Sequence, residues 1–143
     1  MAAPDKAFLA MLSVCGVVVW TKASAAGPQG VWLRDDGNAR VEFAPCGDKL
    51  CATNLWIKDT SGGEEVGDKL VMTLQAKNAT TLVGTAYDRK RDRTYSLTIV
   101  LGEGSMATRG CILGGLLCKQ VNWTPLGPAA PTHTQPPPPR SRH

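Results

Sequence analysis

The part of the chain that we expect to fold holds few side chains for acid–base or nucleophilic chemistry. Both histidines, His133 and His143, lie at the C-terminal end. Ser-His and Cys-His catalysis and a His-ligated metal site are therefore excluded from the expected domain. The adjacent acids Asp35-Asp36 and Glu64-Glu65 lie in turn-rich sequence. Sequence neighbours in a strand point to opposite faces, so these acids do not predict a paired-carboxylate hydrolase. We expect a non-enzymatic protein without a metal or a cofactor.

Four cysteines remain in the expected domain once Cys15, near the N-terminus, is set aside: Cys46, Cys51, Cys111 and Cys118. An even number of cysteines in a small exported domain suggests disulfides, and four cysteines allow three connectivities. We favour the local pairs Cys46–Cys51 and Cys111–Cys118, because each encloses a short segment that contains glycine. A zinc site of four thiolates is the alternative, but the spacing of the second pair exceeds the usual two to four residues between ligands.

The N-terminal segment has the pattern of a secretory signal. A short segment with one lysine precedes an apolar run over residues 7–20, and the small residues Ala23-Ser24-Ala25-Ala26 follow. The apolar run is shorter than the roughly 20 residues of a membrane-spanning helix. We expect residues 1–26 to be a signal peptide cleaved after Ala25 or Ala26, and the protein to be exported, periplasmic or secreted. An uncleaved anchor helix is the alternative.

The C-terminal segment is rich in proline. Seven of the ten prolines fall between Pro125 and Pro139. Such a composition favours an extended, solvated chain. We therefore expect one domain over residues 27–124 and a disordered tail over residues 125–143.

Hydrophobic residues alternate with polar ones through the expected domain. Period-two runs around Val41, Leu74, Leu97 and Val121 indicate strands with one buried face. Turn sequences such as Asp36-Gly37 separate the runs. Eight strands are predicted, near residues 30–34, 39–44, 50–58, 70–76, 82–88, 94–101, 105–111 and 119–124. The predicted fold class is all-β, a small eight-stranded antiparallel up-and-down barrel. A two-sheet sandwich is the structural alternative.

Charge argues against nucleic acid as a partner. The whole chain carries a formal net charge of +4, but residues 27–124 hold 12 Lys and Arg against 11 Asp and Glu. A nearly neutral domain lacks the basic face that neutralises phosphates. Positive charge is concentrated locally in Arg89, Lys90, Arg91 and Arg93. These four cations predict either a solvated hairpin loop or a contact with an anionic membrane surface.

Three stretches together resemble an exported bacterial family, domain of unknown function 2147. They are Gly30-Val31-Trp32-Leu33, the block Pro45-Cys46-Gly47-Asp48-Lys49-Leu50-Cys51 with Leu55-Trp56-Ile57 after it, and Arg109-Gly110-Cys111 with Cys118 and Trp123-Thr124 near the end. The resemblance implies a small lipocalin-like barrel outside the cytoplasm with no established biochemical activity. The chain departs from the family pattern after Tyr87-Asp88, where Arg89 to Arg93 replace a turn that in the family contains proline and glycine.

Candidate ligand-binding residues are aromatic or basic. Trp32 and Trp123 lie in the first and last strands and are expected to close the barrel. Trp56, Tyr87 and Tyr95 carry N–H or O–H groups that a polar ligand can satisfy when they are buried. Arg109 is expected either to stack on a tryptophan at the closed end or to meet a ligand carboxylate.

Two functions follow as hypotheses. The first is binding or transport of a small hydrophobic or amphiphilic ligand in the barrel interior through Trp56, Tyr87, Tyr95 and Arg109. The second is a cell-envelope interaction module with a solid core, which contacts an envelope protein or an anionic membrane through its surface, the basic loop or the proline-rich tail. An interior cavity of a few hundred Å³ favours the first hypothesis.

Overall fold

A computed structural model describes residue 16 and residues 27–129 of the chain. The expected signal peptide, apart from residue 16, and most of the expected proline-rich tail lie outside the described residues. Among the described residues, no helix is long and apolar enough to cross a membrane.

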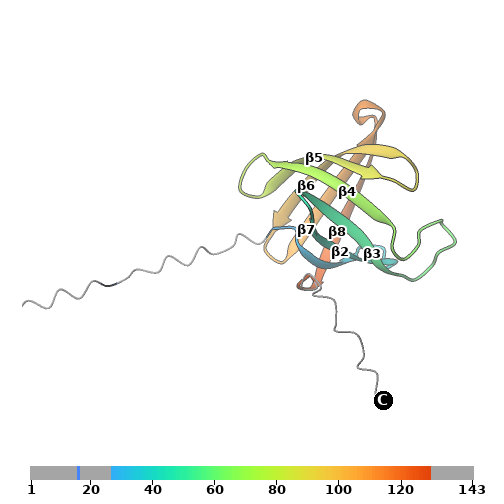
Figure 1. The fold of residues 1–143 in the computed structure, drawn as a ribbon, viewed down its shortest axis with the longest axis horizontal. Helices are drawn as coiled ribbons and strands as arrows, with labels where there is room; N and C mark the ends of the chain where they lie inside the picture. The colour runs from blue at the N-terminus through green and yellow to red at the C-terminus, as the bar shows by residue number, and fades with distance from the viewer. Residues whose placement is uncertain (1–15, 17–26, 130–143) are drawn as a thin grey trace, which may run out of the picture.

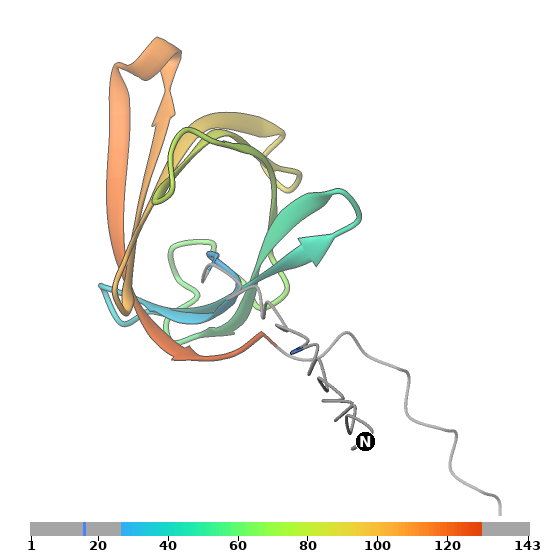
Figure 2. The same cartoon turned by 90° about the vertical axis from the view of Figure 1, so that its left-hand side faces the viewer.

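The described chain forms eight antiparallel strands that close into one barrel (Figures 1 and 2). Each strand pairs with the next along the chain, and β1 pairs with β8 to complete the ring. The strands are β1 (Gly30–Arg34), β2 (Ala39–Cys46), β3 (Lys49–Ile57), β4 (Lys69–Ala76), β5 (Thr81–Asp88), β6 (Arg93–Gly102), β7 (Ser105–Ile112) and β8 (Leu117–Gly127). A short 3₁₀ turn, η1 (Leu113–Gly115), lies between β7 and β8. The predicted all-β up-and-down barrel is confirmed, and closure leaves no unpaired edge strand among residues 27–129.

All eight predicted strands are present, and the largest difference is at the last one. Strand β8 continues through Pro125 to Gly127, three residues past the expected end of the domain at Thr124. Proline lacks an N–H and therefore argued against a strand there. Nevertheless Pro125 is paired with Trp32, at an irregularity in the register between β1 and β8.

The two ends of the barrel differ. Strands β1, β3, β5 and β7 all end at the same end of the barrel, which we call the mouth end. The β1–β2, β3–β4, β5–β6 and β7–β8 connections therefore lie there. The opposite end, which we call the closed end, is packed by large apolar side chains, among them Trp32, Ile99 and Met106. The indole Nε1 of Trp32 donates a hydrogen bond of 3.0 Å to the carbonyl oxygen of Pro28, so burial leaves it satisfied.

Two disulfides tie adjacent strands at opposite ends of the barrel. Cys46 bonds to Cys51 across the β2–β3 turn, and Cys111 bonds to Cys118 at the base of the β7–β8 connection. This is the local connectivity that we favoured from the sequence, and it excludes a four-thiolate zinc site. Disulfides are typical of proteins outside the cytoplasm.

Candidate functional site

The mouth end of the barrel opens into an interior cavity of about 330 Å³. The cavity wall further from the mouth is apolar, because inward-facing positions of most strands carry hydrophobic side chains. The apolar lining comprises Val41, Phe43, Ala52, Leu70, Met72, Ala86, Tyr95, Leu97, Gly110, Val121 and Trp123. The polar lining comprises Arg34, Asn54, Glu64, Asp68, Lys69, Asp88, Arg91, Thr108 and Lys119.

Trp123 and Phe43 form part of the cavity wall. Their rings meet edge to face, with centroids 5.5 Å apart and planes at 82°. The indole Nε1 of Trp123 donates a 3.0 Å hydrogen bond to the hydroxyl of Thr108. Because this polar atom is already paired, the surface that Trp123 offers to a ligand is mainly hydrocarbon.

One ion pair at the mouth joins β1 to the β3–β4 loop. Arg34 donates hydrogen bonds of 2.5 and 2.8 Å to the two carboxylate oxygens of Glu64 and also pairs with Asp36. The guanidinium of Arg34 lowers the pKa of both carboxyls, and Glu64 in turn raises the pKa of Arg34. A two-pronged contact of this kind fixes both position and orientation.

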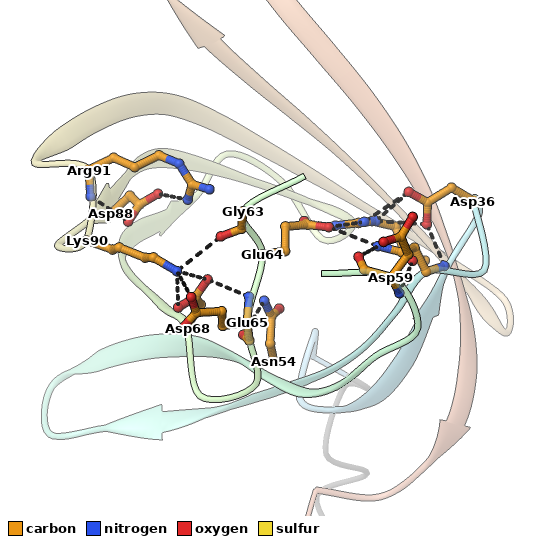
Figure 3. A network of polar contacts seen from close by, with 12 residues as sticks. Asp36, Asn54, Asp59, Gly63, Glu64, Glu65, Asp68, Asp88, Lys90 and Arg91 are labelled. Atoms are coloured by element: carbon orange, nitrogen blue, oxygen red, sulfur yellow. Dashed lines mark hydrogen bonds and ion pairs between the residues drawn. The ribbon is translucent and has the colours of Figure 1, made fainter. Parts of the chain in front are cut away.

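A second group of charges joins the same loop to the β5–β6 turn (Figure 3). Lys90 Nζ donates to the carbonyl oxygen of Gly63 at 3.1 Å and to the Asp68 carboxylate at 3.2 Å. Within the turn, the nearly buried carboxylate of Asp88 accepts hydrogen bonds from the backbone N–H and the guanidinium of Arg91. Asp88 accordingly has a partner for its charge, as burial requires.

These contacts make the β3–β4 loop, residues 58–68, a strap at the mouth of the cavity. Glu64 attaches the strap to β1, while Gly63 and Asp68 attach it to the β5–β6 turn. Its own fold is set by an Asx turn in which Ser61 N–H donates to Asp59. Side chains of the strap, Glu64 and Asp68, contribute to the cavity lining.

Two lysines at the cavity have no ion pair within the described residues. Lys69 begins β4 and Lys119 lies in β8, and both line the cavity. Neither takes part in the ion pairs found among residues 27–129, which involve Arg34, Lys90 and Arg91. Neither lysine lies within ion-pair distance of a carboxylate in this part of the chain, although Lys119, after Arg34, also lowers the pKa of Asp36 through its charge.

Of the four ligand-site residues predicted from the sequence, Tyr95 lines the cavity and the other three do not. Arg109 is exposed between Thr108 and Gly110, which face inward, so strand alternation sends it outward.

The same alternation places Tyr87 outside, between Ala86 and Asp88, where its hydroxyl donates to Asp92 at 2.8 Å. That hydrogen bond raises the pKa of Tyr87. Trp56 lies outside the cavity with the guanidinium of Arg40 4.8 Å from its ring centre. The expected interior placement of Trp56, Tyr87 and Arg109 is therefore corrected.

The sequence reasoning missed Arg34, Asp88 and Glu64. Arg34 follows Trp32 by two positions, and Asp88 follows Ala86 by two, so strand parity alone would have placed both side chains inside. Glu64 carries no such signal, because it reaches the mouth through a loop whose path depends on its tertiary contacts.

The cavity lining is apolar over one part and charged over another. No group of three or more potential metal ligands occurs among the described residues. Its lining combines a hydrocarbon wall with charged groups at one end, which suits a molecule that is itself apolar at one end and charged at the other.

Comparison with known proteins gives a family. A family of uncharacterised proteins conserved in bacteria, DUF2147, matches residues 30–125, which is most of the barrel. The chain belongs to this family. No curated protein and no solved structure matches the chain.

Proposed function

We propose that the barrel binds a small amphiphile, with an apolar tail in the cavity and an anionic headgroup at the mouth. The observation that carries the proposal is the cavity of about 330 Å³, apolar inside and charged at one end. Small-molecule sites usually occupy about 300–1,000 Å³. The cavity volume is near the lower limit of this range, so the proposed ligand is compact, such as a single acyl chain.

The affinity would come mainly from apolar area removed from water, roughly 25 cal/mol per Å². Lys69 and Lys119 supply the preference for an anion, since they lack ion pairs within the described part of the chain. Arg34 and Arg91 contribute less, because Glu64 and Asp88 already neutralise them.

The proposed role is carriage or storage, not catalysis. The absence of histidine from residues 27–129 supports a non-enzymatic role. We also propose that the protein is exported from the cytoplasm, and the two disulfides support export. The alternative of a solid-core interaction module has less support, because the interior at the mouth end holds a cavity.

A titration with dodecanoate tests the proposal. Intrinsic fluorescence is followed in a Trp56→Phe background, which removes the exposed indole outside the cavity. Of the two barrel tryptophans that remain, Trp123 reports from the cavity wall, while the buried Trp32 does not line the cavity. We expect saturable binding of dodecanoate and weaker binding of dodecanol. No saturable signal with either compound would overturn the proposal.

The headgroup assignment is tested with a double variant, Lys69→Gln with Lys119→Gln. The preference for dodecanoate over dodecanol is expected to disappear, while dodecanol binding stays unchanged. The matched control is Lys49→Gln with Lys77→Gln, two lysines whose side chains do not line this cavity. An equal loss in both double variants would show that net charge, not the mouth, sets the preference.

A further inference from the structure

The tip of the β7–β8 hairpin exposes apolar side chains where a turn is normally polar. The segment between Cys111 and Cys118 reads Ile112-Leu113-Gly114-Gly115-Leu116-Leu117. Leu113, Leu116 and Leu117, which we call the leucine tip, are 67%, 83% and 56% exposed. The hairpin, orange in Figures 1 and 2, reaches beyond the neighbouring strands in both views. Three leucines are thus presented to solvent at the far end of an extended hairpin.

The backbone holds this exposure in place. Leu113 has a φ of 53°, in the left-handed region that leucine rarely adopts and that glycine or asparagine would occupy with less strain. The disulfide Cys111–Cys118 closes the base of the tip and fixes the two strands there. A leucine that is strained and also exposed contributes little to folding, so its presence favours a role in contact with an apolar partner.

Basic side chains lie near the tip. Arg109 and Lys119 lie on the hairpin, one on each strand, close to the disulfide. Strand β6 runs alongside, with Ser96 paired to Cys111, so Arg93 and the β5–β6 turn lie at the same end. Arg89, Arg93 and Arg109 form no ion pair within residues 27–129, whereas Lys90 and Arg91 do.

We propose that the leucine tip docks the protein on an anionic phospholipid bilayer. The leucines enter the boundary between headgroups and acyl chains, and Arg93 and Arg109 meet the lipid phosphates. Apolar side chains flanked by basic ones are the usual means of interfacial membrane binding. The cavity mouth then opens beside the membrane surface.

A bilayer suits the tip better than a protein surface does. Stable protein interfaces involve about 20–30 residues a side, and the tip offers one six-residue loop without an aromatic anchor. Unpaired cations next to exposed leucines complement a surface that is anionic outside and apolar beneath. The proposal does not depend on any ligand in the cavity.

Vesicle cosedimentation tests the proposal with the chain from Gly27 on, which contains the whole closed barrel and both disulfides. The vesicles are phosphatidylcholine alone, and phosphatidylcholine with phosphatidylglycerol in equal amounts. We expect binding to the mixed vesicles that weakens with added salt, and little binding to phosphatidylcholine alone. Absence of binding to the mixed vesicles at low salt would overturn the proposal.

Two double variants test whether vesicle binding depends on the leucine tip or reflects nonspecific adsorption. Leu113→Asn with Leu116→Gln should weaken binding to mixed vesicles at least about tenfold, since burial of one leucine side chain is worth that much. Asparagine at position 113 suits the left-handed backbone, so the hairpin is expected to keep its shape. The control, Val100→Gln with Leu126→Gln, changes two exposed apolar residues outside the tip and should bind as the parent does.

Equal affinity of the tip variant and the parent would contradict the proposal. Circular dichroism confirms that each variant is folded. Size-exclusion chromatography tests the alternative that the leucine tip docks on a second copy of the chain. A dimer that the tip variant dissociates, without vesicle binding by the parent, would also overturn the proposal.

Discussion

Arg34, the last residue of β1, donates hydrogen bonds to both carboxylate oxygens of Glu64, which lies in the β3–β4 loop thirty positions further along the chain. The Arg34 side chain is largely buried, at 12% exposure, and Glu64 is 31% exposed. This pair joins the barrel wall to the strap that lies at the mouth of the cavity. A weaker Arg34–Glu64 ion pair should therefore let the strap separate from β1 more readily.

Replacing Glu64 by glutamine should loosen the strap more than it destabilises the barrel. The neutral amide loses the charge-assisted contact with Arg34, yet the barrel strands keep their pairing. Hydrogen exchange of residues 59–67 should accelerate, while the free energy of unfolding falls by about 1 kcal/mol or less. The control Glu103→Gln, in the exposed β6–β7 turn, should change neither quantity. Unchanged exchange in Glu64→Gln would refute the strap's dependence on this pair.

Acid should release the strap. Arg34 lowers the pKa of Glu64 and of Asp36 below their ordinary values of about 4.3 and 3.9. Carboxyls with lowered folded-state pKa contribute stability that is fully present above those ordinary values and is lost as pH falls through the lowered ones.

Hydrogen exchange of residues 59–67, corrected for the intrinsic pH dependence, should therefore be constant near neutral pH and rise below about pH 4. The rise should be smaller in Glu64→Gln, which lacks one of the two titrating groups. An identical acid response in the parent and the variant would show that other carboxyls control the loop.

Gly84 in β5 should be intolerant of a side chain. A Cβ built there overlaps the carbonyl oxygen of Thr73 in the paired strand and lies 2.9 Å from its carbonyl carbon. Backbone cannot move aside as a flexible side chain can, so Gly84→Ala should destabilise the barrel by about 2 kcal/mol or more. Gly110→Ala is the matched control, because a Cβ at Gly110 meets nothing within 4 Å. Thermal denaturation of both variants measures the difference, and equal melting temperatures would contradict the geometry.

Each disulfide should stabilise the barrel modestly. The bonded cysteines are 5 and 7 positions apart in sequence, and loops this short give about 2 kcal/mol each in the loop-entropy model. The double variants Cys46→Ala with Cys51→Ala, and Cys111→Ala with Cys118→Ala, should each lower the urea midpoint. Cys51 is also buried, so its removal should have the larger effect. A variant pair with no change in midpoint would contradict this expectation.

Alternation predicted the barrel well because strand geometry is local. Val41 and Phe43, or Leu97 and Ile99, repeat every second residue, and the same repeat sends them to the buried face in the structure. Turn residues such as Asp36-Gly37 marked strand ends for a similar reason. The end of β8 was missed since Pro125 argues locally against a strand, while its partner Trp32 lies more than ninety positions away.

The site was harder to predict than the fold. Tyr87 and Arg109 have the outward parity of their strands. Trp56 has the same parity as the cavity-lining Ala52 and Asn54, but a register irregularity in the β2–β3 pairing, between the partners of Arg40 and Val41, places it outside. Arg34 and Asp88 have inward parity, but charged side chains are rarely buried, so residue type argues against the placement that parity gives. Glu64 reaches Arg34 through a loop, and no local pattern encodes that meeting.

Filling the cavity tests the central claim most directly. Gly110 lines the cavity and has open space where a side chain would begin, so phenylalanine there should occupy the interior without a clash at its Cβ. Calorimetric titration with dodecanoate should give saturable binding for the parent and for Gly110→Ala, and at least about tenfold weaker binding for Gly110→Phe, with all three proteins folded. Unchanged dodecanoate affinity in Gly110→Phe, or no binding by the parent, would contradict the claim that the barrel interior is the binding site.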